Sequence, residues 1–168
     1  PTMGGLLILV AFSVSSLLWM PLSNPYLWPV LLIAISFGAI GGIDDWMKLH
    51  KRSHNGMSAR MKILLQLIIA FAATLVFIEL SPDQLRYGVA VPFFKDTLLT
   101  MGMFYVPFSM MVIVGASNAV NLTDGLDGLA IVPVMIVAGC FALIAYLAGN
   151  YNFAAYLQIN YVPGTGDL

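Results

Sequence analysis

The chain has 168 residues, of which 60% are hydrophobic and only 9% are charged. Soluble domains carry about 25% charged residues, so this composition excludes an ordinary soluble domain and indicates an integral membrane protein. The formal net charge of -1 and the lack of a long basic run give no support for a nucleic-acid partner. The one cysteine, Cys140, lies in an apolar run, which excludes an internal disulfide and favours a packing role.

Five apolar segments are long enough to cross a membrane, which takes about 20 mostly apolar residues. They are residues 4–20, 26–43, 62–80, 98–116 and 129–149. We therefore predict an all-α fold, a polytopic bundle of transmembrane helices that forms one membrane domain over residues 1–168. Between the third and fourth segments, apolar residues alternate well enough to predict a short hairpin within residues 81–97. Because the chain starts without Met and ends in a loop-like sequence, we expect a fragment of a longer protein.

Basic residues gather after the second segment and predict the orientation in the membrane. Of the seven Lys and Arg residues, five lie here: Lys48, Lys51, Arg52, Arg60 and Lys62. The positive-inside rule assigns this loop to the cytoplasm, and successive loops then alternate between the two sides. The expected cytoplasmic parts are 1–5, 44–61 and 117–128, and the expected periplasmic parts are 21–25, 81–97 and 150–168. The basic side chains could contact anionic lipid headgroups, steer a phosphorylated substrate, or do both.

The adjacent carboxylates Asp44 and Asp45 are the first candidate site. We expect them at the C-terminal end of the second helix, where carboxylates oppose the helix dipole and repel each other unless a cation is near. Such a pair suits Mg²⁺, which binds one or two carboxylates together with substrate phosphate and water. The alternative is that the pair only marks the water interface, but ionisable residues at membrane depth are costly and therefore suggest function.

A polar stretch at residues 117–130 is the second candidate site. Its amide, hydroxyl and carboxylate side chains suit hydrogen bonding to a nucleotide base, a ribose or a sugar. They are Asn118, Asn121, Thr123, Asp124 and Asp127. Gly125 and Gly128 predict a loop that leads into the fifth helix. For Asp127 the alternative is an N-cap of that helix, which contributes about 1 kcal/mol.

Two weaker patterns are also present. Backbone N–H groups at Pro1-Thr2-Met3-Gly4-Gly5 could hold a phosphate at a helix start, or the sequence could simply begin a helix. His50 and His54 have the spacing of a zinc-binding pair. They lack a third ligand nearby, so solvated interface histidines are the favoured interpretation.

These motifs together resemble the phospho-N-acetylmuramoyl-pentapeptide transferases, a branch of the polyprenyl-phosphate N-acetylhexosamine-1-phosphate transferase superfamily. The resemblance is carried by Pro-Thr-Met-Gly-Gly at 1–5, Gly-x-x-Asp-Asp ending at Asp45, Val-Pro-Phe-Phe-Lys-Asp at 91–96, and Asn-Ala-Val-Asn-Leu-Thr-Asp-Gly-Leu-Asp-Gly-Leu-Ala at 118–130. The first and third of these motifs favour the peptidoglycan branch over relatives that act on simpler UDP-sugars.

The resemblance implies a ten-helix, Mg²⁺-dependent enzyme of the bacterial inner membrane, often a homodimer, with its active site on the cytoplasmic face. Such an enzyme transfers phospho-MurNAc-pentapeptide from UDP-MurNAc-pentapeptide to undecaprenyl phosphate, forming lipid I and UMP in peptidoglycan synthesis. The matched catalytic and metal-binding positions are Asp44 and Asp45. The matched substrate-binding positions are Thr2, Arg52, Arg60, Asn118, Asn121, Asp124 and Asp127. A third essential aspartate and a His-rich loop would lie beyond Leu168, so the fragment alone is expected to be inactive.

Three other functions are weighed against this one. A related transferase for another UDP-sugar shares most of the motifs. A transporter or channel would place its acidic residues near the bilayer midplane, whereas here they fall at predicted helix ends on one face. A CDP-alcohol phosphotransferase also uses an Asp-Gly-rich helix start, but it requires Ala-Arg soon after the first Asp-Gly, and here Ile131 follows Ala130.

Overall fold

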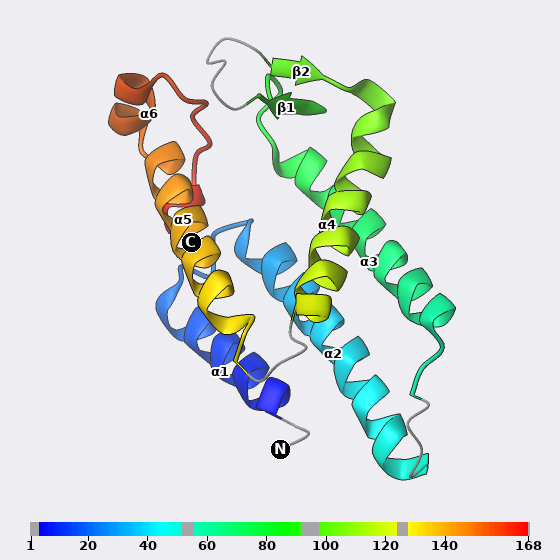
Figure 1. Cartoon of the computed structure of the whole chain (residues 1–168). Helices are drawn as coiled ribbons and strands as arrows, with labels where there is room; N and C mark the ends of the chain where they lie inside the picture. The colour runs from blue at the N-terminus through cyan, green and yellow to red at the C-terminus, as the bar shows by residue number, and fades with distance from the viewer. Residues whose placement is uncertain (1–3, 52–55, 92–97, 124–127, 168) are drawn as a thin grey trace.

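The computed structural model describes residues 4–51, 56–91, 98–123 and 128–167, and it confirms the all-α fold (Figure 1). Long helices follow one another with short connections. They are α1 (Gly4–Trp19), α2 (Leu27–Lys51), α3 (Ala59–Leu80), α4 (Tyr105–Thr123) and α5 (Ile131–Gly149). Two further helices, α6 (Tyr151–Leu157) and the short 3-10 helix η2 (Thr165–Asp167), follow α5.

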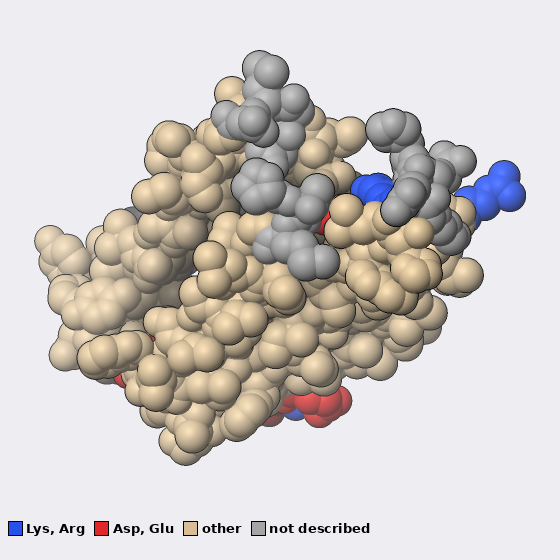
Figure 2. Space-filling model, turned by 90° about the horizontal axis from the view of Figure 1, so that it is seen from below, with Lys and Arg blue, Asp and Glu red and all other residues tan. Residues whose placement is uncertain are grey.

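Four helices in the described part of the chain are long and apolar enough to cross a membrane. They cover Leu27–His50, Ala59–Leu80, Gly102–Thr123 and Ile131–Gly149. The first helix, α1, is equally apolar but has only 16 residues. None of the residues of α5, all of which are described, is buried, and Figure 2 shows a surface that is uncharged over most of its area. Large exposed apolar faces of this kind suit contact with lipid.

The segment between α3 and α4 contains a hairpin, as predicted, but its second strand lies beyond the predicted residues 81–97. Strand β1 (Gly88–Ala90) pairs antiparallel with β2 (Leu98–Thr100), and Val89 lies opposite Leu99. Because the second strand uses residues 98–100, the prediction that the fourth helix starts at residue 98 was wrong. A 3-10 turn, η1 (Gly102–Phe104), leads instead into α4, which begins at Tyr105.

Helix α3 lies between α2 and α4, and α1 packs against α2. The small core consists mainly of side chains on α2 and α3: Leu27, Leu31, Ile40, Ala70, Ala73 and Ile78. Small residues such as the two alanines let transmembrane helices approach closely. On the other side of α2, Leu9 of α1 lies directly over Gly38, where a Cβ atom would come within 2.6 Å of the Leu9 Cδ2 atom.

Hydrogen bonds join the connections at one end of the bundle. The Asn24 side chain in the α1–α2 turn donates to the carbonyl of Gly164 over 2.6 Å. The Tyr26 hydroxyl donates to the carbonyl of Leu80, the last residue of α3, over 2.9 Å. The segment after α6 folds back on α5, where the Val162 N–H donates to the carbonyl of Ala148. Asp44 and Asp45 lie toward the opposite end of α2.

Candidate active site around Asp44 and Asp45

Asp44 and Asp45 lie inside α2, which continues to Lys51. The prediction that the second helix ends at residue 43, and that the two carboxylates sit at its C-terminus, was therefore wrong. The residues that follow, through Lys51, contain neither Gly nor Pro, so nothing in the local sequence stops the helix. Because the helix continues, a basic side chain one turn further along α2 can lie beside the two carboxylates.

That basic side chain is Lys48. Its ammonium Nζ lies 2.6 Å from Oδ2 of Asp44 and 3.3 Å from Oδ1 of Asp45. The spacing from Asp44 to Lys48 is i,i+4, at which oppositely charged side chains on a helix meet. From the sequence, Lys48 was expected to contact anionic lipid headgroups or to steer a phosphorylated substrate, and its link to the pair was not predicted. The i,i+4 spacing of Asp44 and Lys48 could have indicated the ion pair, but only if the helix was known to continue to Lys48.

The two neighbouring carboxylates differ in their surroundings. Asp44 is 13% exposed, and its Oδ1 accepts a 2.6 Å hydrogen bond from the backbone N–H of Met57 in the α2–α3 connection. Asp45 is 50% exposed, and its one hydrogen bond among the described residues comes from Lys48. Short charge-assisted hydrogen bonds to both of its oxygens hold Asp44 in place. Asp45 is therefore the carboxylate with room for a ligand.

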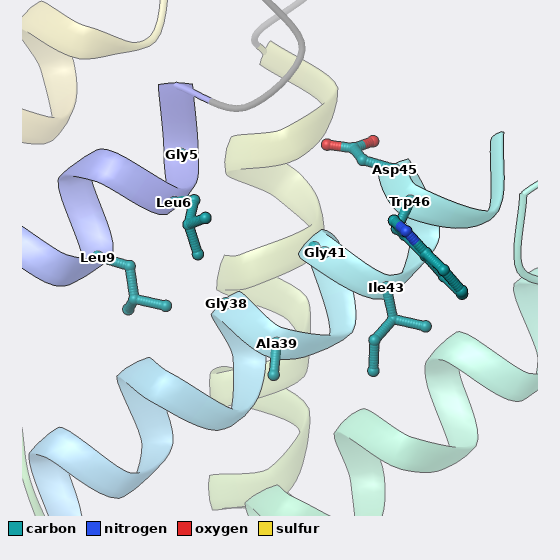
Figure 3. A pocket seen from close by; sticks show the side chains of 10 residues that line it. Gly5, Leu6, Leu9, Gly38, Ala39, Gly41, Ile43, Asp45 and Trp46 are labelled. Atoms are coloured by element: carbon teal, nitrogen blue, oxygen red, sulfur yellow. The ribbon is translucent and has the colours of Figure 1, made fainter. Parts of the chain in front are cut away.

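A groove of about 530 Å³ between α1 and α2 begins beside Asp45 (Figure 3). Its lining is apolar apart from that carboxylate. The lining residues are Gly5, Leu6 and Leu9 of α1 and Gly38, Ala39, Gly41, Gly42, Ile43, Asp45 and Trp46 of α2. The three α2 glycines present no side chain to the groove. The sequence alone did not predict this groove.

The first half of the second candidate site is helical where a loop was predicted. Helix α4 continues to Thr123, so residues 117–123 of the expected loop belong to it. The Asn118 side chain donates both N–H groups of its amide, to Oε1 of the buried Gln66 on α3 and to the carbonyl of Val114, each over 2.8 Å. This amide therefore joins α3 to α4, a structural role that was not predicted. Among the described residues, its carbonyl oxygen has no hydrogen-bond donor.

The other predicted substrate-binding residues are placed in part. Asn121 is exposed near the end of α4, and Arg60 is exposed in the first turn of α3. Thr2, Arg52, Asp124 and Asp127 lie outside the described residues, as does His54. The N-cap interpretation of Asp127 was wrong, because α5 begins at Ile131 with Ala130 at the cap position and no side-chain cap. His50 stacks on Trp46, with 5.4 Å between ring centroids.

Within the described ranges, no three His, Cys, Asp or Glu side chains are close enough to form a metal site of their own. Mg²⁺ does not require one, because it commonly binds through one or two carboxylates and takes its other ligands from substrate phosphates and water. The half-exposed Asp45 beside the more enclosed Asp44 fits that mode of binding.

The family model for glycosyl transferase family 4 matches residues 27–162. The chain belongs to this family. Its members are membrane-bound transferases that move a phosphosugar to polyprenyl phosphate, so the superfamily that the motifs resemble is confirmed. The matched region includes Asp44, Asp45, Lys48 and the whole of α4, and thus both candidate sites. Membership identifies a transferase and counts against the transporter, channel and CDP-alcohol alternatives.

Proposed function

We propose that this family 4 chain acts in the transfer of phospho-MurNAc-pentapeptide from UDP-MurNAc-pentapeptide to undecaprenyl phosphate, which forms lipid I and UMP in peptidoglycan synthesis. The observation that carries the proposal is the Asp44–Asp45 pair with Lys48 at the mouth of an apolar groove. Family membership supports the reaction class. The motifs at residues 1–5 and 91–96 support the peptidoglycan branch over a transferase for another UDP-sugar.

The chemistry requires that negative charges be brought together. A phosphate oxygen of the lipid acceptor becomes bonded to the phosphorus that carries the sugar, the bond from that phosphorus to UMP breaks, and UMP leaves with the electron pair. Electrostatic stabilisation and positioning dominate catalysis of phosphoryl transfer. Lys48 supplies one positive charge within 2.6 Å and 3.3 Å of the two carboxylates. Bound Mg²⁺, for which Asp45 is the better placed carboxylate, would neutralise further charge on the pyrophosphate.

The apolar groove supports a polyprenyl acceptor. Such a lipid carries its phosphate on a long hydrocarbon chain, so its site needs an apolar surface that begins beside the polar one. The groove begins at Asp45 and extends along α2 past Gly41 toward Leu9 and Gly38 (Figure 3). An acceptor whose chain lay in the groove would hold its phosphate at the carboxylate pair. The lipid would reach the site by lateral diffusion within the membrane, which favours encounter with the donor.

The nucleotide-sugar donor is assigned to the second candidate site. We propose that the exposed Asn121 and the carbonyl oxygen of Asn118 contact it, together with Thr2, Arg52, Arg60, Asp124 and Asp127. The amide, carboxylate and basic side chains suit a uridine, a sugar and phosphates respectively. The proposal includes the bacterial inner membrane as the location, the cytoplasmic face as the side of the site, and a homodimer as the assembly.

The test is a transfer assay in membranes that hold the full-length protein. Radiolabelled UDP-MurNAc-pentapeptide and UDP-GlcNAc are offered separately with undecaprenyl phosphate and Mg²⁺, and lipid-linked sugar is measured. We expect lipid I from the first donor and no product from the second. Asp45→Asn should abolish the product, whereas Asp83→Asn, at the hairpin end of the bundle, should not. Product from UDP-GlcNAc alone would overturn the peptidoglycan assignment.

A further inference from the structure

The connection between α2 and α3 returns to touch Asp44. At Gly56, an added Cβ atom would overlap Oδ1 of the Asp44 carboxylate and would lie 2.8 Å from Cε of Lys48. The next residue, Met57, donates its backbone N–H to the same Oδ1 over 2.6 Å. Two successive backbone units thus lie directly against one carboxylate. A residue with any side chain at position 56 could not occupy this place without moving the carboxylate or the connection.

The segment that contacts Asp44 is held in place by the start of α3. Ser58, which follows Met57, is the N-cap of α3, and its hydroxyl accepts from the N–H of Met61. The Lys62 N–H donates to the Ser58 carbonyl over 3.0 Å, which is the first helical bond of α3. Gly56 and Met57 are therefore placed by the start of a helix that packs on α2. The contact with Asp44 is made by a fixed part of the fold.

The result is a carboxylate held on both oxygens. Lys48 contacts Oδ2 and the Met57 N–H contacts Oδ1, each over 2.6 Å. Asp44 is accordingly 13% exposed, while Asp45, one residue later, is 50% exposed and opens on the groove. A free pair of neighbouring carboxylates would rotate independently about their side-chain bonds. Here one member is fixed and the other is available.

From these contacts we infer that Gly56 and Met57 are positioning residues, whose backbone clamps the Asp44 carboxylate against Lys48 so that Asp45 is the carboxylate presented to the substrates. The inference deepens the proposed function, on which its kinetic test rests. The clamp itself is a property of the fold and can be measured without any transferase activity.

The first test measures carboxylate reactivity in the full-length protein. Esterification with a small diazo reagent, followed by fragment-ion mass spectrometry, reports Asp44 and Asp45 separately. We expect Asp45 to react faster in the wild type, in line with the exposed fractions of 50% and 13%. Gly56→Ala should raise the rate at Asp44, whereas Gly115→Ala on α4, where a Cβ atom meets nothing within 4 Å, should change neither rate. Equal wild-type rates, or the same pattern in both variants, would overturn the inference.

The second test measures kinetics. A carboxylate displaced by about 1 Å should cost roughly 10- to 100-fold in turnover, so Gly56→Ala should lower kcat while the KM for the nucleotide-sugar donor stays unchanged. Met57→Pro, which removes the N–H, should also lower kcat. Met57→Leu, which keeps the N–H, should retain the wild-type kcat. Loss through KM alone, or equal loss in both Met57 variants, would contradict the clamp. If the protein transferred no sugar phosphate at all, the proposed function would fail and the esterification rates would still decide the inference.

Discussion

The Nζ atom of Lys48 lies 2.6 Å from Oδ2 of Asp44, one helical turn earlier on α2. The lysine also contacts Asp45, so a single cation is shared by two adjacent carboxylates. Because ionisable groups near a membrane are retained at a cost, this three-residue cluster is the strongest sign of function in the described chain. The structure also shows here what the sequence did not, namely that Lys48 belongs to the site.

Removing the shared cation should impair the site directly. In Lys48→Met, two neighbouring carboxylates lose their common partner, and we expect lipid-linked product to fall by roughly 100- to 1,000-fold, the range for loss of one positioned charge stabiliser. Lys48→Arg keeps the charge and should retain more activity than Lys48→Met. Arg86→Met, at the hairpin end, serves as the control for loss of a basic residue. Equal activity in the two Lys48 variants would contradict this role.

The two aspartates should differ in their effect on stability. Asp44→Ala removes charge-assisted hydrogen bonds to Lys48 and Met57, each of which contributes about 1.5–3 kcal/mol, so the thermal midpoint in detergent should fall clearly. Asp45→Ala loses only a half-exposed ion pair, which contributes about 0–1 kcal/mol. Both variants should lose transferase activity. A larger destabilisation by Asp45→Ala than by Asp44→Ala would contradict the observed contacts.

Filling the groove should affect the lipid acceptor alone. Gly41 lines the groove, and a Cβ atom there meets nothing within 4 Å, so Gly41→Leu can fold while its side chain occupies the groove. We expect the KM for undecaprenyl phosphate to rise about tenfold, which corresponds to about 1.4 kcal/mol, with no change for the UDP-linked donor. Gly139→Leu on α5, also an open position, is the matched control. A change confined to the donor KM would show that the groove does not hold the acceptor.

The bond between Asn118 and Gln66 should be measurable as a helix–helix coupling. Interhelical hydrogen bonds in membranes contribute on average about 0.6 kcal/mol and at most about 1.7. A double-mutant cycle with Asn118→Ala and Gln66→Ala, followed by unfolding in detergent, should give a coupling energy in that range. If Asn118 also contacts the donor through its carbonyl oxygen, Asn118→Ala should raise the donor KM more than Gln66→Ala does. Zero coupling would argue against the structural role.

Some features could be predicted from the sequence because they depend on neighbouring residues. Runs of apolar residues predict helices by their length alone, so five segments were placed near their observed positions. Alternation predicted a hairpin after the third helix, although its second strand lies beyond the predicted residues 81–97. Helix ends were predicted less accurately. The predicted end of the second helix at residue 43 and the predicted start of the fourth at residue 98 were wrong. Hydropathy marks where apolar residues begin and end, whereas a helix begins and ends with its backbone hydrogen bonds. Helix α2 continues past the carboxylates, and the hairpin takes the residues before α4.

The sequence by itself determined the membrane class, the carboxylate pair and the motifs that resemble the superfamily. Only the tertiary structure decided which carboxylate is held, because the Met57 N–H that holds Asp44 comes from the other side of a chain reversal. It likewise decided that the Asn118 amide bonds to Gln66, 52 residues away in the chain, and that an apolar groove opens beside Asp45. Hydropathy and spacing report on neighbours along the chain. The state of a side chain in a site depends on atoms that only the packing of helices brings near.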